Sequence, residues 1–217
     1  MPPMFNPLMF FVEIGYTFFI LFFCFLIYIK TKEIYDLTKH KGIYYFRNTF
    51  LFFGLAYLLR FLFGIIMMTE RWIDFIHIPR HAMRPLTSLF TGYFSTMALL
   101  CLIYSTIWKR FSSKEFFIAS NIIALLIAVS AAISQEVFIL TQIFLLIIAI
   151  VLSIVIKKKS KLSKIHILYF LLFLFWIISL ILLIPRWMLP LEIRIIMEII
   201  SMALFAVLYY KVAKWTK

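Results

Sequence analysis

Four ionic residues stand inside otherwise apolar stretches of this chain, at Glu13, Arg60, Arg194 and Glu198. A charge at the centre of a bilayer costs about 2.5–3.5 kcal/mol on insertion scales, so such residues pair with one another or belong to a binding or transport site. Counted from the ends of their stretches, all four lie roughly 5–12 Å deep along a helix that rises ~1.5 Å per residue. Because three separate stretches place charges at the same depth, the sequence predicts that these side chains meet.

Helical spacing places further polar residues on the same faces as these charges. Ser201 continues the i, i+4, i+7 stripe that begins with Arg194 and Glu198. Polar faces of membrane helices turn toward the bundle interior, so we expect an outward-open pocket lined by the first, second, third and seventh spans. The predicted ligand-binding residues are Glu13, Thr17, Tyr57, Arg60, Thr91, Arg194, Glu198 and Ser201.

The chemistry of this predicted pocket follows from its two arginines. A planar guanidinium suits bidentate pairing with carboxylate or phosphate groups. Three interpretations stay open: the arginines pair with the glutamates and hold the bundle together, they also bind a ligand, or the stripe passes protons or ions. The favoured function is receptor-like binding of a small anionic or polar ligand, or of a lipid head group. A transporter and a non-catalytic structural subunit of a membrane complex are the alternatives.

The elements that must position these residues are apolar runs long enough to cross a bilayer. Each approaches the ~20 residues that a helix needs to span ~30 Å of hydrocarbon. Seven such runs occupy nearly all of the 217 residues: Leu8–Ile29, Ile43–Met67, Leu86–Trp108, Phe116–Ile133, Val137–Ile156, Ile165–Ile184 and Leu191–Tyr210. None alternates apolar and polar residues as barrel strands do. The sequence predicts one all-α domain over residues 1–217, a polytopic transmembrane bundle of seven spans.

Positive charge fixes the expected orientation of this bundle. Sixteen of the 22 basic residues fall in clusters that follow every second span, at residues 30–47, 109–114, 157–164 and 211–217. The positive-inside rule makes these ends cytoplasmic, so we expect a multi-pass protein of the cell membrane with its N-terminus outside and its C-terminus inside. Attraction to anionic lipid accounts for the net charge of +13, and no nucleic-acid partner is expected. A cytoplasmic protein partner would dock on residues 30–47 or 157–164.

Other motifs carry weaker predictions. Asp74, His77 and His81 have the spacing of a zinc site, but Pro79 interrupts the helix that such a site would need, and an interfacial loop is favoured. No metal or cofactor is expected. Nucleotide-binding loops, nucleophile elbows and thiol–histidine pairs within one span are absent from the sequence, which favours a protein that is not an enzyme.

Two local patterns bear on packing. Ala124, Ala128 and Ala132 form a small-residue face, which predicts either an internal seam between helices or a homodimer face. The first helix is expected to run past the membrane through Lys41 and to stop at Gly42, because basic residues followed by glycine mark a helix end.

Overall fold

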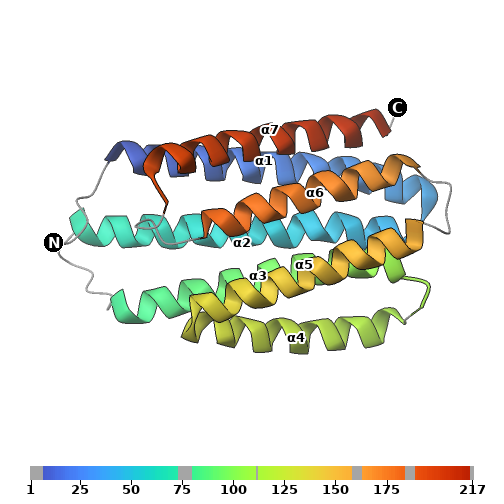
Figure 1. The fold of residues 1–217 in the computed structure, drawn as a ribbon, viewed down its shortest axis with the longest axis horizontal. Helices are drawn as coiled ribbons and strands as arrows, with labels where there is room; N and C mark the ends of the chain where they lie inside the picture. The colour runs from blue at the N-terminus through green and yellow to red at the C-terminus, as the bar shows by residue number, and fades with distance from the viewer. Residues whose placement is uncertain (1–6, 73–79, 111, 158–162, 184–188, 216–217) are drawn as a thin grey trace.

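The chain forms a bundle of long, roughly parallel helices (Figure 1). The computed structural model describes residues 7–72, 80–110, 112–157, 163–183 and 189–215. These residues form α1 (Pro7–Thr38), α2 (Lys41–Trp72), α3 (Arg80–Ile107), α4 (Ser113–Ile133), α5 (Gln135–Lys157), α6 (Ser163–Leu182) and α7 (Leu191–Trp215). Within these ranges there is no β-strand, so the all-α prediction is confirmed.

Five of these helices are long and apolar enough to cross a membrane. They are the first five in the chain, with apolar parts Val12–Thr38, Lys41–Ile66, Pro85–Ile107, Ser113–Ile133 and Gln135–Val155. In α6 the corresponding stretch is shorter, Ile167–Leu182. The membrane-protein character of the fold is confirmed at this level, whereas seven complete crossings and their direction stay predictions.

Six helices close into a ring around a shared interior. Among the described residues, close backbone contacts join α1 to α2, α2 to α3, α3 to α5, α5 to α6, α6 to α7 and α7 back to α1. The remaining helix, α4, packs outside this ring against α3 and α5, at the edge of the bundle opposite α1 and α7 (Figure 1). The outward face of α4 exposes six large apolar side chains: Phe117, Ile118, Ile122, Leu125, Leu126 and Val129.

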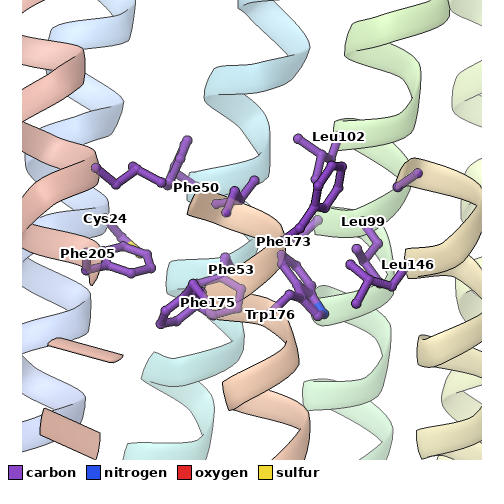
Figure 2. Packing of buried hydrophobic residues seen from close by; sticks show 14 of the residues in the cluster. Cys24, Phe50, Phe53, Leu99, Leu102, Leu146, Phe173, Phe175, Trp176 and Phe205 are labelled. Carbon is purple, nitrogen blue, oxygen red and sulfur yellow. The ribbon is translucent and has the colours of Figure 1, made fainter. Parts of the chain in front are cut away.

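Aromatic side chains fill the middle of the ring. Phe53 of α2 lies with its ring centroid 5.1 Å from that of Phe175 and 5.0 Å from that of Trp176, both on α6. Phe205 of α7 approaches Phe175 to 4.3 Å between centroids. Figure 2 shows these rings together with Phe50 in the space between the helices. Because lipid is as apolar as these side chains, their close packing, not exclusion from water, stabilises the contact.

The small-residue face of α4 is an internal seam. Ala124 and Ala128 are completely buried, and Ala131 lies beside them while Ala132 is turned partly away. Opposite this face, a Cβ added to Gly92 of α3 would lie 2.9 Å from the Cβ of Ala131. Glycine is therefore needed for α3 and α4 to approach this closely. A homodimer stays a prediction, but Ala124 and Ala128 are buried within the same chain, on the side of α4 that faces α3.

The first helix ends earlier than the sequence predicts. It stops at Thr38, and Lys39 takes the left-handed backbone conformation, with φ of 51°, that usually falls to glycine. Gly42, the predicted stop, lies instead in the first turn of α2. A Cβ there would meet the carbonyl oxygen of Ser105 at 3.0 Å, so this glycine permits α2 and α3 to pack closely.

The helix directions separate basic residues from the buried ionic ones. The end of α1 and the start of α2 lie at the same end of the bundle as the α3–α4 corner and the end of α7 (Figure 1). This end carries Lys30, Lys41, Lys109, Lys114 and Lys214. Glu13 and Arg194 lie near the starts of α1 and α7, and thus toward the opposite end.

The contact at Gly92 yields a stability prediction with a matched control. Gly92→Ala is expected to lower the melting temperature in detergent, and Gly92→Val to lower it further, because overpacking costs about 1–3 kcal/mol. Gly15 of α1 has no atom within 4 Å of an added Cβ. Gly15→Ala should leave the melting temperature unchanged or raise it. Equal melting temperatures for Gly92→Ala and Gly15→Ala would contradict the seam.

Candidate functional site

The four ionic residues that the sequence singled out line one hollow in the half of the bundle away from the lysine-rich end. This first hollow has a volume of about 70 Å³. Its polar lining comes from α1, α2 and α7, and Leu182 of α6 adds an apolar wall. The residues that carry its polar groups are Glu13, Tyr16, Thr17, Tyr57, Arg60, Arg194 and Glu198.

Arg194 binds the two carboxylates of the hollow. Its Nη2 donates a hydrogen bond of 3.1 Å to Oε1 of Glu13, which ties α7 to α1. Its Nε lies 3.5 Å from Oε1 of Glu198, one turn later on the same helix. The side chains of Arg194 and Glu198 are 7% and 5% exposed, so both charges are buried and depend on each other. This part of the site matches the predicted structural pairing.

Glu198 keeps one oxygen unused. Its Oε2 is buried and accepts no hydrogen bond from the residues that the structure describes. A buried acceptor without a donor costs about 1–3 kcal/mol, and more when it is charged. Glu198 is one of the residues that line the first hollow.

A chain of hydroxyl groups runs from the hollow into the interior. The Tyr16 hydroxyl lies 2.9 Å from Oγ of Ser201 and 3.3 Å from the hydroxyl of Tyr57. All three residues are buried, and they come from α1, α2 and α7. The shorter contact is a good hydrogen bond and the longer one is weak. Together they fix the positions of the three helices on the inner side of the ionic cluster.

Arg60 differs from Arg194 in its contacts with the described residues. Its side chain is exposed, and it forms no hydrogen bond or ion pair with the described residues. The expected pairing of both arginines with the two glutamates is therefore seen for Arg194 but not for Arg60. Arg60 lines the first hollow and also a second hollow on the other side of α2.

The second hollow has a volume of about 80 Å³ and lies among α2, α3, α5 and α6. Thr91, which the sequence placed in a single pocket with the other residues, lines this second hollow and not the first. The predicted pocket is thus divided, with Tyr57 and Arg60 shared between its two parts. The polar groups of the second part also include Ser95, Gln142 and Ser179.

Two of the predicted ligand-binding hydroxyls already have a use within their own helices. Thr17 donates its proton to the carbonyl oxygen of Glu13 at 2.8 Å, and Thr91 donates to that of Thr87 at 2.6 Å. An anion needs donors, and these hydroxyls have no second proton to give. The guanidinium of Arg60 is therefore the main donor available to an anion in either hollow.

Sequence reasoning missed two residues of this region. Tyr16 lies three residues after Glu13, on the same helical face, so the spacing that selected Thr17 would also have found it. Gln142 is an amide inside one of the most apolar helices, and this was the signal for it. Its Nε2 donates to Oγ1 of Thr96 at 2.7 Å, and its Oε1 has no partner among the described residues.

The weak zinc candidate lies largely beyond the described structure. Asp74 and His77 are outside the described residues, and of His81 only the backbone position in α3 is described. Among the described side chains no group of three His, Cys, Asp or Glu residues is placed to hold a metal ion. The prediction about this motif therefore stays untested.

The Arg194 cluster yields a second stability prediction. Arg194→Leu leaves two carboxylates close together without their cation, and we expect it to cost about 3–5 kcal/mol of unfolding free energy. Replacing all three members with apolar residues of similar size (Glu13→Met, Arg194→Leu and Glu198→Met together) should recover most of this loss. Denaturant unfolding in micelles measures both. A triple variant as unstable as Arg194→Leu would show that the cluster is not held by charge pairing.

Comparison with known proteins places the chain in a family without assigning an activity. No family model and no solved structure matches it. A protein of Archaeoglobus fulgidus, described as uncharacterized, is 33% identical over 222 residues, covering 98% of this chain and 96% of that protein. The similarity covers nearly the full length of both proteins, and the chain belongs to the same family as that archaeal protein.

Proposed function

We propose that this protein binds a small anionic or polar group at Arg60, presented by a soluble ligand or a lipid head group, and acts as a receptor-like membrane protein. The observation that carries the proposal is the difference between its two site arginines. Arg194 is held by two carboxylates, whereas Arg60 is exposed on the two hollows and makes no hydrogen bond or ion pair with the described residues.

An arginine in this position needs a counter-charge. A cation in the membrane is costly unless it pairs with another group or reaches the interface. Glu13 and Glu198 are already engaged by Arg194, so an anionic group from outside the chain is the natural partner of Arg60. The volume of about 70 Å³ is roughly half of the ~150 Å³ cavity that accepts benzene, which favours a phosphate- or carboxylate-sized group.

The interior of the ring favours binding over transport. One turn below Ser201, Phe205 is fully buried and packs against Phe50, Phe53 and Phe175. Figure 2 shows Phe50, Phe53, Phe175 and Phe205 filling the space between their helices. A transporter would have to move this aromatic cluster aside. The specific observation in favour of transport is the pair of hollows that meet at Arg60, and a flux measurement separates the two functions.

In this proposal the hollows face the outside of the cell membrane. The lysine-rich end carries the basic residues at 30–47 and 109–114 together with Lys211 and Lys214, and these would lie in the cytoplasm and contact anionic lipid. A cytoplasmic protein partner would bind there, on the basic residues that this end presents. The structural alternative, a subunit held in a complex, rests on the Arg194 cluster alone and leaves Arg60 without a role.

Binding is tested with inorganic phosphate on the purified protein in nanodiscs. Phosphate should raise the melting temperature of wild type, since saturation a hundredfold above Kd adds about 2.7 kcal/mol. Arg60→Gln should lose this shift because it removes the donor and its charge. Arg110→Gln removes an exposed arginine at the α3–α4 corner and should keep the shift. A normal shift in Arg60→Gln would contradict the proposal.

The same variants separate binding from transport when they are reconstituted into proteoliposomes. A receptor binds phosphate without moving it across the membrane, so no flux of labelled phosphate is expected for wild type. Flux of phosphate in wild type and Arg110→Gln that disappears in Arg60→Gln would show that the protein is a transporter and not a receptor.

The orientation has its own test. On a background without cysteine, Glu192→Cys places a thiol at the exposed start of α7, and Lys109→Cys places one at the lysine-rich end. A membrane-impermeant maleimide should label the first variant in intact cells and the second only after permeabilisation. The reverse pattern would show that the hollows open toward the cytoplasm.

A further inference from the structure

The ionic residues around the first hollow balance each other in charge but not in position. Arg60 and Arg194 carry two positive charges, and Glu13 and Glu198 carry two negative ones. Arg194 lies between the two carboxylates, so these three residues together carry one negative charge. Arg60 supplies a separate positive charge on the same hollow. The hollow thus has a positive group and a negative group that both face its interior.

The negative side has an unused acceptor. Glu198 is only 4% exposed, and its Oε2 is buried and accepts no hydrogen bond from the described residues. The residue lines the hollow that Arg60 also lines. A carboxylate oxygen in this state calls for an N–H or O–H donor placed in the hollow. An anion alone would satisfy Arg60 and leave this oxygen as it is.

We propose that the ligand is a zwitterion that carries a primary ammonium group next to its anionic group. This inference rests on the proposed function, because it takes the anion site at Arg60 as given. The anionic group pairs with Arg60, and the ammonium donates to Oε2 of Glu198. The small volume of the hollow admits the charged groups of the ligand, with any larger remainder outside.

Charge balance gives the reason for preferring a zwitterion. The charges of the four ionic residues sum to zero, and a neutral dipolar ligand keeps this sum while it pairs with both Arg60 and Glu198. A simple anion would leave the net negative charge of Glu13, Arg194 and Glu198 uncompensated. A simple cation would leave the positive charge of Arg60 uncompensated. Within a site of low dielectric constant, each such imbalance is costly. A primary ammonium is required because a trimethylated one has no N–H to donate and is bulkier.

The proposal is tested with three soluble phosphodiesters that differ in one group. Glycerophosphoethanolamine carries the primary ammonium, glycerophosphocholine the trimethylated one, and glycerophosphoglycerol a hydroxyl. Calorimetry on the full chain in nanodiscs should show at least tenfold tighter binding of the first than of the other two. Native mass spectrometry with the corresponding lipids then distinguishes the sources, because retention of phosphatidylethanolamine indicates a lipid head group and binding of only the soluble probe indicates a free ligand.

Two variants connect this selectivity to the residues. Glu198→Gln should reduce the preference for ethanolamine over glycerol at least fivefold, while Glu192→Gln, exposed on the same helix, should leave this preference unchanged. Arg60→Gln should weaken all three probes. Equal wild-type affinities for the ethanolamine and glycerol compounds would overturn the zwitterion and leave the anion site standing. Affinities that Arg60→Gln does not alter would instead overturn the proposed function. The wild-type comparison decides the matter even if Glu198→Gln does not fold.

Discussion

The ion pair between Arg194 and Glu13 closes the helical ring. It joins the last helix to the first, and the hydroxyl contacts of Tyr16 with Ser201 and Tyr57 lie on its inner side. Polar contacts of this kind matter in an apolar surrounding, where packing alone must otherwise hold helices together. The same arginine also neutralises Glu198, so that one cation holds two carboxylates that would otherwise repel. The residues of this cluster line the first hollow together with Arg60, so the shape of the hollow depends on them.

Below this cluster the interior changes from polar to aromatic within a turn of helix. Ser201 and Phe205 are both fully buried and lie four residues apart on α7. The cluster of Phe50, Phe53, Phe175 and Phe205 supports Tyr57, whose ring centroid lies 4.9 Å from that of Phe53. This packing limits the movement of the Tyr57 ring, to which the weak contact with the Tyr16 hydroxyl adds little. The polar site is therefore built on a firm apolar base, as a binding site requires.

Periodicity predicted much of this arrangement because each relevant signal was local. Apolar length identified the helices, and i, i+4 spacing placed Arg194, Glu198 and Ser201 on one face. The same rule extends to Tyr16, which shares a face with Glu13. The end of α1 was predicted wrongly because the left-handed position fell on Lys39. Gly42 was needed for a close approach to α3, a reason that no local pattern shows.

The sequence by itself determined that the chain is all-helical and apolar enough for a membrane, since length and composition are properties of the chain. Spacing along the helices also predicted that the four charges meet, and all four line one hollow. Only the tertiary structure decided which charge pairs with which. Both arginines are equally plausible partners for the glutamates in the sequence, but helix packing brings Arg194 to Glu13 and leaves Arg60 on the hollows. It also divided the expected pocket at Tyr57 and Arg60, because α2 stands between Thr91 and the ion cluster. Rotation of each helix about its axis sets these distances, and that rotation depends on the side chains of every neighbouring helix at once.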